Sequence, residues 1–131
     1  MVGSIAQDEE AVEVSGKLCR VTKDSTWVTE VPNHIAYRLT PMVSPKLCPG
    51  AQIEFYVGEF EPGEGRAIPH VHANEDHVFY VLSGRATSKV GDELHSLEPG
   101  DALWVPKGEV HDFDVIGGET FRVIAIFAPP R

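Results

Sequence analysis

The sequence is short of positive charge, with 11 lysine and arginine residues against 20 acidic residues and a net charge of −9. Nucleic acids and anionic membranes are bound through basic patches, so we expect neither as a partner. Long hydrophobic runs are also missing: the longest spans about six residues, at 123–128, whereas a membrane-spanning helix needs about 20. The chain opens without a charged and then apolar leader, which predicts a cytoplasmic protein.

Cysteine is scarce as well, because Cys19 and Cys48 are the two present. Two cysteines are too few for a disulfide framework, and we expect free thiols. The chain has 131 residues, of which 42% are hydrophobic. This length and composition suit one domain with one sizeable core.

Helical periodicity is also lacking. Prolines at 32, 41, 45 and 49 interrupt the segment 17–48 and its end, which favours two or three short strands over helices. From residue 51 onward, short β-branched or aromatic runs alternate with turns, and their spacing leaves no room for crossover helices. We therefore predict an all-β fold, an antiparallel β-sandwich or jelly-roll barrel. Residues 17–131 form its single domain, and residues 1–16 form a flexible acidic arm.

Turn residues divide the second half of the chain into short segments. We predict strands at 52–60, 77–82, 86–90, 93–97, 102–105, 111–116 and 119–127. Gly91-Asp92 predicts a hairpin between 86–90 and 93–97, and Gly117-Gly118 predicts another between 111–116 and 119–127.

Two of the six histidines form the pattern His70-Val71-His72. Side chains at i and i+2 of an extended strand point to one face, so both imidazoles enter the same space. A shared metal ion is the usual way to hold such imidazoles neutral and oriented. His77 and His111 each open a predicted strand further along the chain. We assign no functional role to His34 or His95, the remaining two histidines.

The spacing around these histidines resembles the two sequence motifs of the cupin family. Pro69-His70-Val71-His72, four residues, His77, six residues and Gly84 resemble the first motif. Gly100, five residues, Pro106-Lys107-Gly108, two residues and His111 resemble the second. The motifs cover residues 63 to 115, and 15 residues separate them, as in a short single-domain cupin. Gly84, Gly100 and Gly108 fall where the strands of a small barrel reverse sharply.

The resemblance implies a metal site held by His70, His72, His77 and His111. His77 stands where most cupins have a glutamate ligand, and Asp76 is the alternative fourth ligand if the alignment shifts by one residue. Four neutral imidazoles leave a divalent ion its full charge, which strengthens it as a Lewis acid. Iron, manganese, nickel, zinc and copper all suit such ligands.

These features predict a metal-dependent enzyme acting on a small enolisable carbonyl compound, with isomerase, cyclase or lyase chemistry. Two alternatives stay open: a dioxygenase that cleaves a β-diketone or phenolic substrate with O2, and a cupin that binds a small molecule without catalysis. The resemblance also implies a homodimer, formed through the N-terminal arm or an edge strand at 35–39.

Strand parity predicts the pocket wall. If His77 and His111 face inward, so do Phe79, Val81, Phe113 and Val115, which suits an apolar or aromatic substrate. Glu54 and Tyr56 are weak candidates for a catalytic base, although we expect their face of strand 52–60 to be solvated. Arg38, Arg66 and Arg122 could bind a carboxylate, but we expect each to serve surface solubility.

Overall fold

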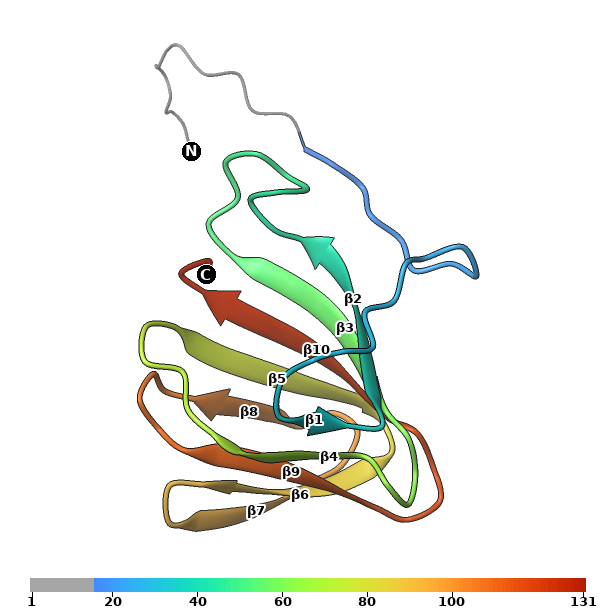
Figure 1. Ribbon diagram of the computed structural model, residues 1–131, viewed down its shortest axis with the longest axis vertical. Helices are drawn as coiled ribbons and strands as arrows, with labels where there is room; N and C mark the ends of the chain where they lie inside the picture. The colour runs from blue at the N-terminus through green and yellow to red at the C-terminus, as the bar shows by residue number, and fades with distance from the viewer. Residues whose placement is uncertain (1–15) are drawn as a thin grey trace.

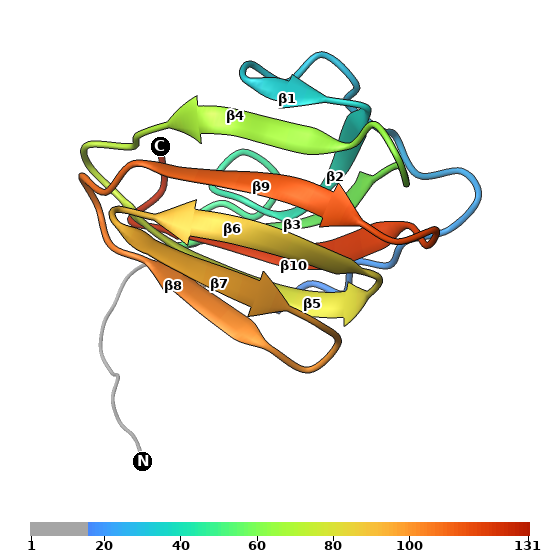
Figure 2. The same cartoon turned by 90° about the horizontal axis from the view of Figure 1, so that it is seen from below.

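The computed structural model describes residues 16–131, which form two five-stranded antiparallel sheets (Figures 1 and 2). One sheet has the order β1-β4-β9-β6-β7 and the other the order β2-β3-β10-β5-β8. The strands are β1 (His34–Ile35), β2 (Tyr37–Val43), β3 (Glu54–Phe60), β4 (Arg66–His70), β5 (Asp76–Ser83), β6 (Arg85–Val90), β7 (Glu93–Leu97), β8 (Ala102–Val105), β9 (His111–Ile116) and β10 (Phe121–Ala128). The described residues contain no helix, and hence none that could cross a membrane.

The all-β antiparallel prediction is therefore confirmed. The acidic arm predicted at residues 1–16 lies, apart from Gly16, outside the described part of the chain.

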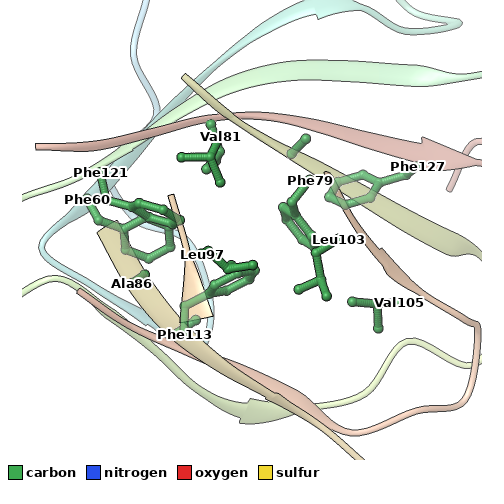
Figure 3. Close-up of a cluster of buried hydrophobic side chains, with 13 residues drawn as sticks. Phe60, Phe79, Val81, Ala86, Leu97, Leu103, Val105, Phe113, Phe121 and Phe127 are labelled. Atoms are coloured by element: carbon green, nitrogen blue, oxygen red, sulfur yellow. The ribbon is translucent and has the colours of Figure 1, made fainter. Parts of the chain in front are cut away.

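Alternation of side chains along the strands builds the core between the two sheets (Figure 3). On β10, Phe121, Val123, Ala125 and Phe127 are buried, while the residues between them are half-buried. This period-two pattern is that of a strand with one face on a core. Figure 3 shows Phe60 and Phe121 at one end of the core and Phe127 at the other. His72 and His77, described below, lie beside Phe127.

Gly84 carries the chain from β5 in one sheet to β6 in the other. Its φ is +75°, and a Cβ at this position would lie 2.4 Å from the carbonyl oxygen of Thr120. Only glycine adopts this conformation at little cost and fits against that backbone. Gly100 and Gly108 also have positive φ, so the predicted sharp reversals are present at all three glycines.

One of the two predicted hairpins is correct and the other is wrong. β6 and β7 pair through the Gly91-Asp92 turn. β9 and β10, however, lie in different sheets, β9 between β4 and β6 and β10 between β3 and β5. Their buried faces oppose each other across the core, with the rings of Phe113 and Phe121 6.1 Å apart. Both strands find partners from distant parts of the chain, so the Gly117-Gly118 turn connects the sheets.

β1 and β2 stand at the edges of their sheets. Edge strands carry unpaired backbone groups that can pair with another chain. The homodimer through residues 35–39 stays a prediction.

Candidate metal centre

Strand pairing and one bend bring four histidines together. His70 at the end of β4 is the cross-strand partner of His111 at the start of β9, and their ring centroids are 4.3 Å apart. His72 follows in the bend, and its ring lies 5.0 Å from that of His70 and 4.1 Å from that of His77 on β5. His72 is thus the member that joins the two pairs.

The bend that carries His72 is held by the turn before His111. The backbone N–H of Gly108 donates to the carbonyl oxygen of His72 at 2.7 Å. Gly108 has a φ of +85°, so the glycine of the second motif shapes the backbone of the first. The two motifs therefore build one site by direct contact.

The ring nitrogens of these histidines form two overlapping groups suited to a metal ion. In each group the candidate ligand atoms lie within 4.8 Å of one another: His70, His72 and His111 form one, and His72, Glu75 and His77 form the other. Imidazole and carboxylate are ordinary ligands for divalent transition metals. The described residues thus contain a histidine-rich site that can bind a metal ion.

Hydrogen bonds behind the rings orient them for this task. Nδ1 of His70 lies 2.7 Å from the carbonyl oxygen of Ile68, and Nδ1 of His111 lies 3.2 Å from that of Glu109. A carbonyl oxygen can only accept, so each Nδ1 carries the hydrogen and each Nε2 keeps its lone pair. Metal-binding histidines typically have their second nitrogen bonded in this way.

The buried ring nitrogens of His77 and His111 show whether the site fits a metal ion. His77 and His111 are 2% and 1% exposed, and both nitrogens of His77 and Nε2 of His111 have no hydrogen-bond partner among the described residues. Buried polar atoms without partners are costly, and such cases call for an explanation. A cation at the centre of the cluster would take the lone pair of one His77 nitrogen and that of His111 Nε2, so the donor set fits a metal.

The same burial keeps the imidazoles neutral. Desolvation by burial lowers the pKa of His77 to about 2, with the neighbouring His72 adding to the effect. Burial likewise lowers the pKa of His72 and of His111 to about 4. Neutral imidazole is the form that ligates metal.

These shifts predict that acid destabilises the metal-free protein. A buried histidine stays neutral in the folded state below its ordinary pKa of 6.5, whereas in the unfolded chain it takes up a proton. The free energy of unfolding therefore falls as the pH drops below 6.5, and His77 alone contributes up to about 1.4 kcal/mol per pH unit. Denaturant titration of metal-free protein between pH 6.5 and pH 5 measures the slope.

His77→Phe removes one of the titrating groups and is expected to make this slope shallower. The control is His95→Phe on the edge strand β7, where the ring is partly exposed beside Glu93; it should keep the wild-type slope. Equal slopes for His77→Phe and the wild type would contradict the predicted role of burial.

Asp76 and His77, the two alternatives for the fourth ligand, are successive residues of β5 and face opposite sides of the strand. Asp76 turns away from the histidines: its Oδ1 accepts from the backbone N–H of Lys107 at 3.0 Å and its Oδ2 from Nε1 of Trp104 at 3.4 Å. His77 faces the cluster instead. Glu75, only 8% exposed, places Oε1 3.5 Å from Nδ1 of His72. The buried carboxylate beside the site is thus that of Glu75, which is outside the predicted set of ligands.

A cavity of about 150 Å³ opens beside the histidines. His70, His72 and His77 line it, together with Phe79 and Phe113 of the predicted pocket wall. Val81 and Val115 face inward as parity predicts, but they pack in the hydrophobic core and are not among the lining residues. Phe127, which the sequence analysis had not singled out, takes part in the wall.

The expected solvated face of β3 was wrong. Glu54 is 5% exposed, and the hydroxyl of Tyr56 donates to its Oε1 at 2.5 Å. The backbone N–H of Arg131 and its guanidinium also donate hydrogen bonds to this carboxylate. The buried charge is tolerated because these donors compensate it. Neither Glu54 nor Tyr56 is among the residues lining the cavity.

Two further residues that line the cavity carried no recognisable sequence signal. His34 on β1 lines the cavity, with its ring 5.4 Å from that of His70. Arg131 lines it too, whereas Arg38 and Arg122 pair with Glu59 on β3 and Arg66 is exposed on β4. Both His34 and Arg131 lie far from the motifs in sequence, and no spacing rule connects them.

Comparison with known proteins agrees with this architecture. Residues 56–127 match the model of the cupin domain family. Uncharacterized proteins of Streptomyces coelicolor and Aquifex aeolicus are 40% and 39% identical over 63 and 62 residues, which is 48% and 47% of this chain and 56% and 50% of theirs. The chain thus spans about half the length of these curated relatives.

Solved structures align over most of the chain. KdgF from Halomonas sp. has a TM-score of 0.74 at 21% identity, covering 89% of this chain and 96% of KdgF. The polyketide cyclase RemF from Streptomyces resistomycificus has a TM-score of 0.72 at 25% identity, covering 88% of this chain and 82% of RemF. With the family model matching more than half of its residues, the chain belongs to the cupin family.

Proposed function

We propose that this protein is a metal-dependent enzyme acting on a small enolisable carbonyl compound. The observation that carries the proposal is the cluster of four histidines beside an apolar cavity: His70, His72 and His77 line the cavity, and buried ring nitrogens of His77 and His111 lack hydrogen-bond partners. A divalent transition metal held by His70, His72, His77 and His111 would supply Lewis-acid stabilisation of an enolate oxygen. The likeness to the polyketide cyclase RemF supports chemistry of this class.

The cavity wall suits a small, partly apolar substrate. Phe79, Phe113 and Phe127 contribute aromatic surface beside the histidines. An apolar cavity of about this volume is large enough for one benzene-sized ring. Exclusion of water by these rings would strengthen electrostatic interactions within the site.

His34 is the cavity histidine outside the four predicted ligands, and we assign it proton transfer. Its Nδ1 lies 2.7 Å from the carbonyl oxygen of Pro32, so Nδ1 carries the hydrogen and Nε2 has the lone pair. Burial lowers the pKa of His34, which keeps the ring neutral at pH 7. Stacking on Tyr37, at 4.6 Å, sets the ring plane. Nε2 could accept a proton from one carbon and return it to another.

Proton exchange at carbon tests the proposed function directly. Hydroxyacetone, a chelating hydroxy-ketone, is incubated in D2O with zinc-loaded and with metal-free protein, and loss of its α-proton signals is followed by NMR. We expect exchange to be faster than in buffer with the zinc-loaded protein and not with the metal-free protein. Exchange no faster than in buffer would contradict the proposal.

Two alternative functions have distinct outcomes in parallel assays. Dioxygen uptake by iron-loaded protein with a β-diketone would identify a dioxygenase. Tight binding of such compounds without exchange or dioxygen uptake would identify a non-catalytic binding protein.

A further inference from the structure

Arg131 lies one aromatic ring away from the proposed metal centre. Its Cζ stands 4.0 Å from the centroid of the Phe127 ring, and that ring lies 3.9 Å from the ring of His77. Phe127 is therefore in contact with the guanidinium and with a predicted ligand. Arg131 and His77 also line the same cavity, so one ligand in it can contact both.

A buried carboxylate fixes the position of Arg131. Glu54 Oε2 accepts from the backbone N–H of Arg131 and lies 3.4 Å from its Nε, while Oε1 lies 3.4 Å from Nη2. Burial by itself would raise the pKa of Glu54, but hydrogen bonds from Tyr56 and Arg131 hold it below its usual value. Glu54 is therefore a carboxylate at neutral pH, and it orients the arginine.

The guanidinium still has capacity for a ligand. Nη1 makes no contact with Glu54 among the bonds just described, and 39% of the Arg131 side chain is exposed. A guanidinium carries five N–H donors in a planar fork, so it can serve Glu54 and a second carboxylate together.

Arg131 places a positive charge in the cavity of an acidic protein. The chain has a net charge of −9, so its overall field disfavours anionic ligands unless a local cation offsets it. Among the residues lining the cavity, Arg131 is the one lysine or arginine.

We propose that Arg131 determines specificity by binding a carboxylate group of the ligand whose other end reaches the histidines. Glu54 and Tyr56 are positioning residues for it. The substrate class is thereby narrowed to small carbonyl or phenolic compounds that carry a carboxylate away from the reacting oxygen. This inference rests on the proposed function, because the histidines must hold the metal that anchors the other end.

Two probes that differ by one carboxylate test the inference. Catechol and 3,4-dihydroxybenzoate present the same pair of oxygens to a metal, and the latter adds a carboxylate on the far side of the ring. Calorimetric titration of zinc-loaded protein without oxygen gives both dissociation constants. The preference of each protein is the ratio of the dissociation constant of catechol to that of 3,4-dihydroxybenzoate. We expect this ratio to be about tenfold larger in the wild type than in Arg131→Gln, since a hydrogen bond to a charged group contributes at this level.

Two further variants control for loss of charge elsewhere and for loss of stability. Arg38→Gln, which removes an arginine paired with Glu59 on the outer side of β3, should keep the wild-type preference. If Arg131→Gln is unstable because Glu54 is left without its cation, the double variant Glu54→Gln with Arg131→Gln removes both charges and serves in its place.

The possible outcomes separate the two proposals. Equal preference ratios in the wild type and the Arg131 variant, with zinc and catechol still bound, would overturn the role of Arg131 and leave the proposed function intact. Failure of the wild type to take up zinc would overturn both.

Discussion

His77→Ala is expected to weaken metal binding at least about 100-fold, as severely as His72→Ala, because each removes a ligand. Changes to residues that only support metal ligands already cost 10- to 100-fold in affinity. His77 is 2% exposed, and neither ring nitrogen has another partner. Competition with a chromophoric chelator at pH 7 gives the affinity of each variant.

Asp76→Ala is the matched control, one residue away on the same strand. Its carboxylate bonds the backbone of Lys107 and the indole of Trp104 and points away from the cluster. The variant should therefore retain metal, whatever stability it loses at the Lys107 turn. Loss of metal from Asp76→Ala with retention by His77→Ala would mean that Asp76 is the ligand.

His34→Phe is expected to slow the metal-dependent exchange of hydroxyacetone protons about 100-fold, the lower end of what a positioned base contributes. Phenylalanine can keep the stacking on Tyr37 and Phe60, which lie 4.6 and 5.9 Å from the His34 ring. It removes the lone pair of Nε2. The same NMR assay, run on zinc-loaded wild type and variant, measures the change.

Two controls distinguish proton transfer from a structural effect of this substitution. Zinc affinity should be unchanged in His34→Phe, because His34 is outside the four predicted ligands. His95→Phe on β7 should leave the exchange rate at the wild-type value, since this ring lies beside Glu93 on an edge strand and not in the cavity. An exchange rate in His34→Phe equal to that of the wild type would mean that another residue is the base.

Local patterns in the sequence predict much of the fold. The turn chemistry at Gly91-Asp92 correctly predicts the β6–β7 hairpin. The strand at 102–105 has the predicted bounds in β8. Such features depend on neighbours in the chain and on backbone conformation, which residue types constrain directly.

Patterns fail where long-range packing competes with them. Gly117-Gly118 has the composition of a hairpin loop, yet β9 and β10 pair with other strands in different sheets and face each other across the core. Glu54 has the polarity of a surface residue, yet Arg131, 77 positions away, compensates its charge in the interior. Neither partner can be identified from the residues around these positions.

By itself, the sequence determined the all-β class, the alternation that turns His77 and Phe79 inward, and the histidine spacing of the site. These follow from the period of two along a strand and from turns made by neighbouring residues. Only the tertiary structure decided that His34 and Arg131 line the cavity and that Asp76 bonds the backbone of Lys107. Those placements depend on contacts between distant strands, which the free energy of packing selects and local residue patterns do not encode.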